Sequence, residues 1–263
     1  HAMLVPVQYD RIMRLPDYDD FDHSSMKYKF STSAPLREDL KRKVVERFEG
    51  ELVEFYGLTE GGISCTLFAN RFPDKLASVG TPAGGEILII DEQGKKLPAG
   101  RAGEIVGRNA NMMRGYVNRE KATDEMLWYD EKGNLFYKTG DVGYFDEDGF
   151  LYLSDRKKDV IISGGFNVFA TDLEIVLGKH EAVQEVAVIG IPSEQWGETP
   201  LALVVLEPGT EEDAEALRNW ANQRLGKGQR IAKLEFRDEL PKSDIGKVLK
   251  RELRTPYWSG RDA

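Results

Sequence analysis

Residues 54–60 read Glu54-Phe55-Tyr56-Gly57-Leu58-Thr59-Glu60, and the interpretation of the chain begins from this stretch. The stretch overlaps the apolar run 52–56, which predicts a strand, and Gly57 follows, where a missing side chain lets the backbone bend closely past its neighbours. Tyr56 offers a flat face to a base. Thr59 offers a hydroxyl to a phosphate oxygen, and Glu60 offers a hard oxygen to magnesium. The pattern therefore indicates a nucleotide site at the end of a strand, with Tyr56 as a core residue as the alternative.

The residues around this stretch predict an α/β arrangement. Tyr28–Ser31 is an expected strand, and Ser33-Ala34-Pro35 is an expected turn. Between residues 36 and 48 the apolar residues recur with the spacing of one helix face, at Leu36, Leu40, Val44, Val45 and Phe48. Gly50 then predicts the end of that helix.

From residue 79 to residue 154 the pattern changes to short strands separated by turns. Glu86–Ile90 reads as a strand, and turn residues stand at 92–94 and at 146–149. The carboxylates of the second turn resemble part of a calcium loop, but Tyr144 occupies the position of the first carboxylate ligand. This segment therefore predicts a hairpin turn in a β-rich subdomain.

The rest of the chain predicts a separate α+β unit. Its expected elements are an amphipathic helix at 211–225, a basic terminal helix beginning at 248–253, and strands at 183–191, 201–206 and 234–236. The short charged segment 155–159 suits a hinge better than a flexible linker. The expected fold class is α/β and α+β multidomain, with a partial α/β subdomain (1–78), a β-rich subdomain (79–154), a hinge (155–158) and a small mobile α+β C-terminal lid domain (159–263).

Composition excludes several functional classes. A formal net charge of −9 argues against a bulk electrostatic grip on nucleic acid or anionic lipid. The single cysteine, Cys65, excludes an internal disulfide and fits a reducing cytoplasm, and three scattered histidines argue against a histidine-based zinc site. No apolar run approaches the ~20 residues that span a bilayer. The start His1-Ala2-Met3 resembles a tag-cleavage scar, which predicts an engineered or proteolysed piece of a longer protein.

Three further segments carry residues suited to nucleotide chemistry: 137–141, 155–166 and 241–247. Asp141 is an acceptor-only carboxylate that suits a pair of ribose hydroxyls. Arg156 is a permanently charged fork that matches phosphate or ribose oxygens. The alternative interpretations are a turn cap for Asp141, an ion pair with Asp155 for Arg156, and a surface lysine in a glycine-containing turn for Lys247.

Taken together and in this order, the four segments resemble the signature stretches of the adenylate-forming superfamily, which contains acyl-CoA synthetases, luciferases and peptide-synthetase adenylation domains. The similarity runs from about Leu4 to Arg254. It implies a reaction in which a carboxylate attacks the α-phosphate of ATP to give an acyl-adenylate and pyrophosphate. A C-terminal lid then swings round, and a thiol displaces AMP.

The resemblance also implies a role for each matching position. Glu60 is expected to hold magnesium. Lys247 is expected to be the lid lysine of the first step, and Thr59 and Glu60 are the other expected catalytic residues. Lys158 is the expected hinge, and Gly164, Gly165 and Phe166 are expected to line the pantetheine route. The expected nucleotide-binding residues are Ser33, Ala34, Pro35, Glu54, Phe55, Tyr56, Gly57, Leu58, Thr59, Asp141, Arg156 and Lys247. The implied cofactors are ATP or AMP, Mg²⁺ and coenzyme A.

The sequence departs from the superfamily pattern in its phosphate loop. No stretch combines several Gly, Ser and Thr with a nearby lysine, as phosphate cradling needs. We therefore expect the chain alone to be inactive and its partners to be a carboxylic acid, ATP, CoA and the missing N-terminal half of the same enzyme. The chain also has Ala170 at a position where the superfamily commonly has proline, and Lys158 at a position where some relatives have aspartate.

The leading interpretation is a cytoplasmic acid–thiol ligase, an AMP-forming acyl-CoA synthetase, acting on a fatty or aryl acid. The small and apolar residues in segment 61–70 are expected to border the acyl pocket, which suggests an apolar acyl group. The alternatives are a stand-alone module that binds AMP or a partner, and another adenylate-forming enzyme, either a peptide-synthetase adenylation domain or a luciferase-like protein. Neither nucleic acid nor a membrane span is expected.

Overall fold

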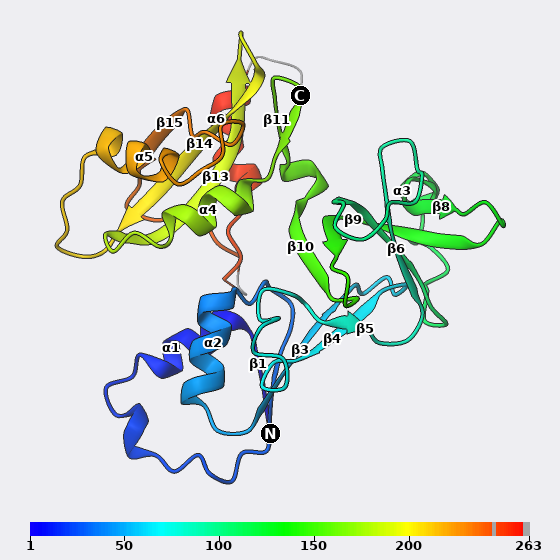
Figure 1. Ribbon diagram of the computed structural model, residues 1–263, viewed down its shortest axis with the longest axis horizontal. Coiled ribbons are helices and arrows are strands. Elements are labelled where there is room, and N and C mark those ends of the chain that lie inside the picture. The colour runs from blue at the N-terminus through cyan, green and yellow to red at the C-terminus, as the bar shows by residue number, and fades with distance from the viewer. Residues whose placement is uncertain (244–245, 260–263) are drawn as a thin grey trace. The chain divides into compact units, whose positions relative to one another are not determined.

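The computed structural model describes residues 1–243 and 246–259, in two compact units, His1–Leu153 and Ser154–Ala263 (Figure 1). Asp244 and Ile245, which belong to the 241–247 segment, and residues 260–263 lie outside the described part.

The first unit begins with a five-stranded sheet in the order β1-β2-β3-β4-β5. The first three strands are parallel, and the last two run antiparallel to their neighbours. The strands are β1 (Ala2–Leu4), β2 (Tyr28–Ser31), β3 (Glu51–Gly57), β4 (Ser64–Phe68) and β5 (Thr81–Pro82). Because β5 pairs with β4, this sheet runs past residue 78, where the sequence placed the end of the first subdomain.

One face of this first sheet is covered by helices. Leu52 and Leu67 point from β3 and β4 into a buried cluster shared with α1 (Pro6–Met13) and α2 (Glu38–Arg47). Side chains alternate between the faces of a strand, so Val53 and Phe55 point to the opposite face. The alternation of β3 thus divides the residues of the 54–60 stretch between two environments.

A second sheet follows in the order β10-β9-β7-β6, with β8 paired to β9. Its strands are β6 (Glu86–Ile90), β7 (Gly103–Arg108), β8 (Leu127–Tyr129), β9 (Leu135–Phe145) and β10 (Leu151–Arg156), and α3 (Glu120–Met126) precedes β8. The predicted hairpin turn lies between β9 and β10, where the amide of Gly149 donates to the carbonyl of Asp146 (3.2 Å). Lys75 forms ion pairs with the carboxylates of Asp146 and Asp148 and so stabilises this turn.

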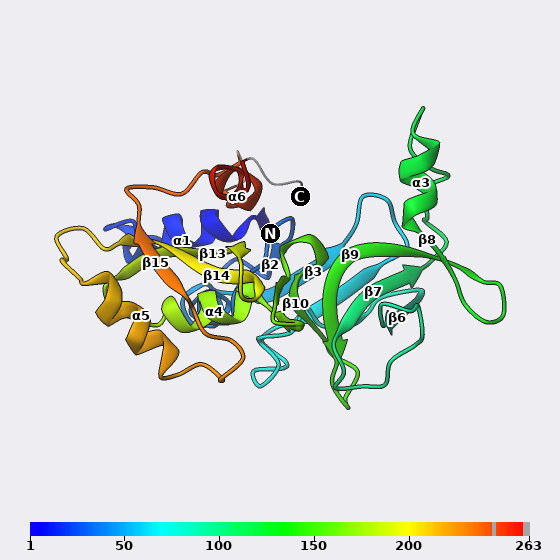
Figure 2. The ribbon, with the colours of Figure 1, turned by 90° about the horizontal axis from the view of Figure 1, so that it is seen from above.

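The second unit has three layers, with helices on both faces of one sheet (Figure 2). The sheet has the order β12-β11-β14-β13, with β15 parallel to β14. Side chains of β13 alternate between the two faces of the sheet. Val188 packs in the cluster with α4 and α5, and Ile189 packs in the cluster with α6. The elements are β11 (Ile161–Ser163), β12 (Phe166–Val168), α4 (Ala170–Leu177), β13 (Val183–Ser193), β14 (Gly197–Leu206), α5 (Ala214–Asn222), β15 (Lys233–Phe236) and α6 (Lys250–Trp258).

Two helices in this unit begin later than the sequence predicted. The helix expected from residue 211 begins at Ala214 because the Asp213 carboxylate caps it, accepting from the amide of Ala216 (2.7 Å). The terminal helix begins at Lys250 rather than Val248, because Val248 forms a β-bridge with Lys242. None of the helices that the structure describes has both the length and the apolar composition needed to cross a membrane.

Candidate functional site

The structure joins two of the four sequence segments in one hydrogen bond. The hydroxyl of Tyr56, at the end of β3, donates to Oδ2 of Asp141 on β9 (2.7 Å), although 85 positions separate these residues. Burial and the neighbouring carboxylate together raise the pKa of Tyr56 well above its ordinary value, so the phenol stays protonated and donates. Tyr56 is thereby the hydrogen-bond partner of Asp141, the residue that is expected to bind the ribose.

Local hydrogen bonds hold Asp141 in place. The hydroxyl of Thr139 donates to the carbonyl of Ile105 on β7 (2.9 Å) and accepts from the Asp141 amide (3.0 Å). Gly140, between them, has φ +68°, a left-handed conformation that glycine adopts at little cost. The Thr-Gly-Asp segment is therefore a kink within β9 that aims a carboxylate, which is 6% exposed, toward β3.

Glu54 is a different case from the other residues of its stretch. Its carboxylate forms an ion pair with Lys41 of α2, and both side chains are buried. Burial raises the pKa of Glu54, and the adjacent Lys41 cation opposes that rise. Phe55, next along β3, points to the opposite face of the sheet and stacks on Phe30 (5.8 Å between ring centroids). The Glu54 and Phe55 side chains therefore point to opposite faces of the sheet and do not meet at one ligand. Glu54 links β3 to α2 through its ion pair with Lys41.

The loop after β3 is clamped by residues 109–116. A side chain on Gly61 would lie 2.1 Å from the carbonyl oxygen of Asn111, and Gly61 has φ +77°, so only glycine fits there. The Met113 amide donates to the carbonyl of Glu60 (2.9 Å), and the Tyr116 hydroxyl donates to its Oε1 (2.7 Å). This hydrogen bond raises the pKa of Tyr116. Sequence reasoning missed Tyr116, since an isolated tyrosine in a loop gives no pattern.

Magnesium fits Glu60 only in a limited sense. Among the residues that the structure describes, no group of three or more His, Cys, Asp or Glu side chains could hold a metal ion. Magnesium is commonly bound by one or two carboxylates together with substrate phosphates and water. A single oriented carboxylate at Glu60 is compatible with that mode of binding.

The remaining expected ligands of the first unit lie at strand ends. Ser33-Ala34-Pro35 follows β2, and Ser33 adopts φ +72°, which is uncommon for a residue with a side chain. Gly57 is the last residue of β3, Leu58 follows it, and Thr59 is exposed in the turn after the strand. Since β2 and β3 are parallel neighbours, both turns emerge at the same edge of the sheet.

The expected hinge lies in a short 3-10 turn (Lys157–Asp159) that follows β10. Arg156 and Lys158 are exposed, and the Arg254 guanidinium of α6 donates to the carbonyl of Lys158 (2.7 Å). Burial raises the pKa of Asp155, and the Lys250 cation opposes this rise. The Arg156 amide donates to Asp155 (2.8 Å), so the carboxylate contacts backbone at the expected hinge.

Gly164 and Gly165 form the tip of the β11–β12 hairpin. Both have positive φ (+58° and +82°), as a two-residue turn of this kind requires. Phe166 begins β12 and is 71% exposed. The Gly164 amide donates to the carbonyl of Trp196 (2.8 Å), and a side chain on Gly164 would approach the Trp196 ring to 2.8 Å. Trp196 is a neighbour of the expected pantetheine loop that the sequence did not reveal.

Lys247 stands in the loop before α6. Its amide donates to the Ser243 hydroxyl (3.2 Å), its carbonyl accepts from the Ser243 amide (2.9 Å), and its side chain is exposed. Lys247 belongs to the second unit, whereas Asp141 and Thr59 belong to the first.

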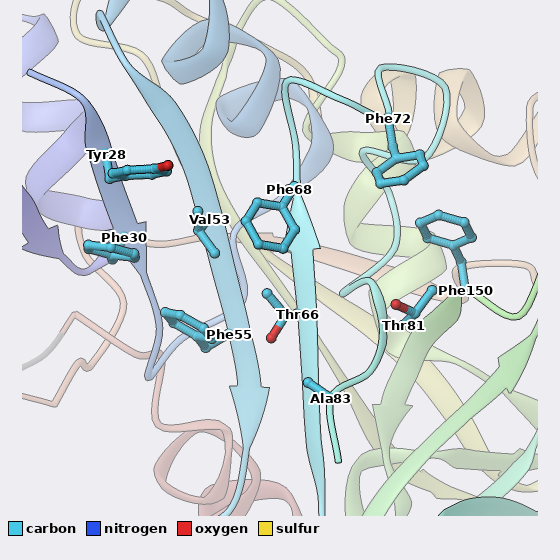
Figure 3. Close-up of a pocket in the computed structure, with 10 residues that line it drawn as sticks. All are labelled: Tyr28, Phe30, Val53, Phe55, Thr66, Phe68, Phe72, Thr81, Ala83 and Phe150. Atoms are coloured by element: carbon cyan, nitrogen blue, oxygen red, sulfur yellow. The ribbon is translucent and has the colours of Figure 1, made fainter.

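The segment 61–70, which is expected to border an acyl pocket, is partly packed in the core of the first unit. Cys65, Leu67 and Ala69 are buried in the core, and burial raises the pKa of the Cys65 thiol to about 12. Only Thr66 and Phe68 of β4 line an open groove of about 550 Å³ (Figure 3). We call it the aromatic groove, after its six aromatic lining residues, Tyr28, Phe30, Phe55, Phe68, Phe72 and Phe150.

Comparison with known proteins shows the family of the chain. The family model described as "AMP-binding enzyme" matches residues 1–117, and "AMP-binding enzyme C-terminal domain" matches residues 172–247. The chain therefore belongs to the family of AMP-binding enzymes. The long-chain-fatty-acid–CoA ligase of Bacillus subtilis is 39% identical over 252 residues, which cover 94% of this chain and 44% of that protein. The 2-succinylbenzoate–CoA ligase of Geobacillus kaustophilus is 40% identical over 221 residues, or 84% of this chain and 43% of that protein.

Solved structures give the same picture. ATP-bound MatB from Rhodopseudomonas palustris has a TM-score of 0.85 at 32% identity, covering 98% of this chain and 50% of that one. O-succinylbenzoate CoA synthetase from Bacillus subtilis, in complex with an acyl-adenylate, has a TM-score of 0.80 at 31% identity, covering 99% and 50%. The chain thus spans about half the length of the proteins that it matches.

Proposed function

We propose that this chain is the C-terminal portion of an ATP-dependent carboxylic acid–CoA ligase. One observation carries the proposal: the Tyr56–Asp141 hydrogen bond joins two segments that the superfamily pattern assigns to the nucleotide. The names of the relatives support this chemistry, since they include long-chain-fatty-acid and 2-succinylbenzoate CoA ligases. The substrate is accordingly a fatty or aryl acid, and the compartment is the cytoplasm.

The proposed reaction has two displacements at one site. A carboxylate oxygen of the acid attacks the α-phosphorus of ATP, and the bond to pyrophosphate breaks. The thiol of CoA then loses its proton and attacks the acyl carbon, and AMP leaves as the acyl–oxygen bond breaks. Asp141 accepts from the ribose hydroxyls, with Arg156 beside it. The turns at 33–35 and 57–59 flank the adenine and the phosphates. Glu60 would hold magnesium, which would supply charge neutralisation.

Lys247 is the proposed cation of the first displacement. A positive charge ~4 Å from a negative oxygen contributes about 4 kcal/mol at an effective dielectric near 20. That energy corresponds to roughly three decades in rate if it is gained only in the transition state. In this proposal residues 159–263 form the lid, 155–158 form the hinge at Lys158, and 1–78 and 79–154 form the nucleotide seat. Gly164, Gly165 and Phe166 line the thiol route after the lid has turned.

The test separates nucleotide binding from turnover. Calorimetric titration of the 263-residue chain with AMP should show binding that Asp141→Asn weakens about 10-fold or more, because a charged hydrogen-bond partner of the ribose is lost. Asp124→Asn, on exposed α3 of the same unit, is the matched control and should bind AMP as the wild type does. Equal binding by wild type and Asp141→Asn would contradict the proposed seat.

Turnover distinguishes the ligase from a stand-alone AMP-binding module. The chain alone, given ATP and a fatty acid, should release no AMP, because no phosphate-cradling loop is present in its sequence. Adding the part of the Bacillus subtilis ligase that lies outside the match should restore acyl-CoA formation. AMP binding through Asp141 with no activity after this addition would favour the module instead.

A further inference from the structure

The carboxylate of Glu60 is held by a neutral donor rather than by a cation. The Tyr116 hydroxyl donates to its Oε1 (2.7 Å), although 56 positions separate the two residues. Among the residues that the structure describes, Lys41 pairs with Glu54, but no lysine or arginine pairs with Glu60. A phenol orients a carboxylate without cancelling its charge. Glu60 therefore keeps the negative charge that a divalent cation requires, whereas Glu54 does not.

The backbone of Glu60 is fixed by the same segment, residues 109–116. The Met113 amide donates to the carbonyl of Glu60 (2.9 Å), and the carbonyl of Met113 accepts from the Tyr137 hydroxyl of β9. The segment is thereby anchored on the second sheet and contacts Glu60 through both its backbone and its side chain. Two contacts from one anchored segment restrict the carboxylate to a small range of orientations.

Tyr116 is itself held by the beginning of α3. Its amide donates to the Thr123 hydroxyl (2.9 Å), and that hydroxyl donates to the carbonyl of Arg119 (3.2 Å), the residue before the helix. A side chain on Gly115 would lie 3.0 Å from the Thr123 side chain, so the loop and the helix are in close contact. None of the residues of α3 is buried, so core packing does not account for this helix. Its contacts on the page place Tyr116.

We propose that Tyr116 is a positioning residue for the magnesium-binding carboxylate. Its hydroxyl holds one oxygen of Glu60 and so sets the orientation of the carboxylate before the cation and the nucleotide bind. Hydrogen-bond partners of metal ligands commonly contribute 10–100-fold to metal affinity, because they reduce the motion that the ligand must lose on binding. The inference rests on the proposed function, since it takes Glu60 to be the magnesium ligand.

The test measures the affinity of the 263-residue chain for a divalent cation directly. Mn²⁺ replaces Mg²⁺, because it prefers the same oxygen ligands and its free form gives an electron paramagnetic resonance signal. Mn²⁺ is titrated into the chain in the presence of AMP, and the loss of the free signal gives the dissociation constant. Tyr116→Phe keeps the ring and removes only the hydroxyl. It should raise this constant by about 10-fold or more.

Three further variants separate positioning from loop stability. Glu60→Gln should weaken Mn²⁺ binding more than Tyr116→Phe does, because it removes the charge of the ligand itself. The double variant of Glu60→Gln with Tyr116→Phe should bind no more weakly than Glu60→Gln alone, because Tyr116 acts only through that carboxylate. Tyr129→Phe is the matched control, since Tyr129 is a 57% exposed tyrosine on β8 of the same unit, and it should bind Mn²⁺ as the wild type does.

A purely structural role would give a different pattern. Damage to the loop would make the double variant weaker than Glu60→Gln alone, because the two losses would then add. That outcome would overturn the proposal, and so would wild-type affinity in Tyr116→Phe, an equal loss in Tyr129→Phe, or the absence of saturable Mn²⁺ binding by the wild-type chain.

The outcome can be separated from that of the proposed function, because AMP binding is measured by calorimetry in the presence of EDTA. Mn²⁺ binding that depends on Tyr116 and Glu60, with AMP binding that Asp141→Asn does not weaken, contradicts the nucleotide seat and leaves the positioning role standing. AMP binding that depends on Asp141, with Mn²⁺ binding that Tyr116→Phe does not weaken, contradicts the positioning role alone.

Discussion

Replacement of Lys41 by methionine should test whether Glu54 is a structural residue. Lys41 is 1% exposed, and its ammonium contacts the Glu54 carboxylate and donates to the carbonyl of Ser78 (2.8 Å). Methionine keeps most of the volume and removes the charge. Glu54 would then be a buried anion without its cation, and such a loss costs about 3–5 kcal/mol of the free energy of unfolding.

Two further variants separate charge from packing. Arg42→Met removes the exposed ion pair with Glu38 (2.8 Å) one position along the same helix, and it should change the free energy of unfolding by less than about 1 kcal/mol. The double variant Lys41→Met with Glu54→Gln removes both buried charges. It should regain at least about half of the loss, because the uncompensated anion is gone.

The destabilisation should depend on pH in a defined direction. Burial raises the pKa of Glu54 in the folded state, and loss of Lys41 removes the effect that opposes this rise. The unfolded value is about 4.3, so between the two values the folded state binds more protons than the unfolded state. Stability is then lost as pH rises through the folded pKa. The deficit of Lys41→Met should be largest at neutral pH and should shrink as pH falls toward about 4.3.

The assay must report on the first unit alone, because the chain has two compact units that can unfold separately. Native-state hydrogen exchange, read by mass spectrometry on peptides that cover β3, gives the free energy of opening for this unit. A loss below about 1 kcal/mol in Lys41→Met, or a loss that grows on acidification, would refute the reasoning. Glu54 would then be free to serve the nucleotide as the sequence first suggested.

Two other substitutions test local geometry. Tyr56→Phe removes the donor to Asp141 and should cost the first unit about 1.5–3 kcal/mol in the same exchange measurement, since the acceptor is a charged group; an unchanged unit would mean that the bond contributes nothing. Gly165→Ala should cost the second unit about 1–2 kcal/mol in urea unfolding, because φ is positive and the surroundings are open. Gly164→Ala should cost more and should also shift the fluorescence of Trp196, whose ring it would contact. Equal costs for the two glycines would show that Trp196 does not pack there.

Local pattern in the sequence was enough for most of the elements. The strand-like composition and flanking turns of 28–31 and 86–90 predicted strands that the structure shows at the same residues. The helix expected at 36–48 exists as Glu38–Arg47, and Leu36 and Phe48 are buried beyond its ends. Where capping or a β-bridge competed with helical periodicity, as at Asp213 and Val248, the predicted boundaries were wrong by two or three residues.

The candidate site was predicted as a set of residues but not as an arrangement. Residue types singled out the four segments, and the resemblance to the adenylate-forming superfamily supplied the expected role of each position. Residue types could not show that Tyr56 faces Asp141, that Glu54 faces Lys41, or that Trp196 lies over Gly164. An alternating strand assigns its residues to two faces, but it carries no information about which element covers each face. That choice is made by contacts between residues far apart in the chain, and only the tertiary structure contains them.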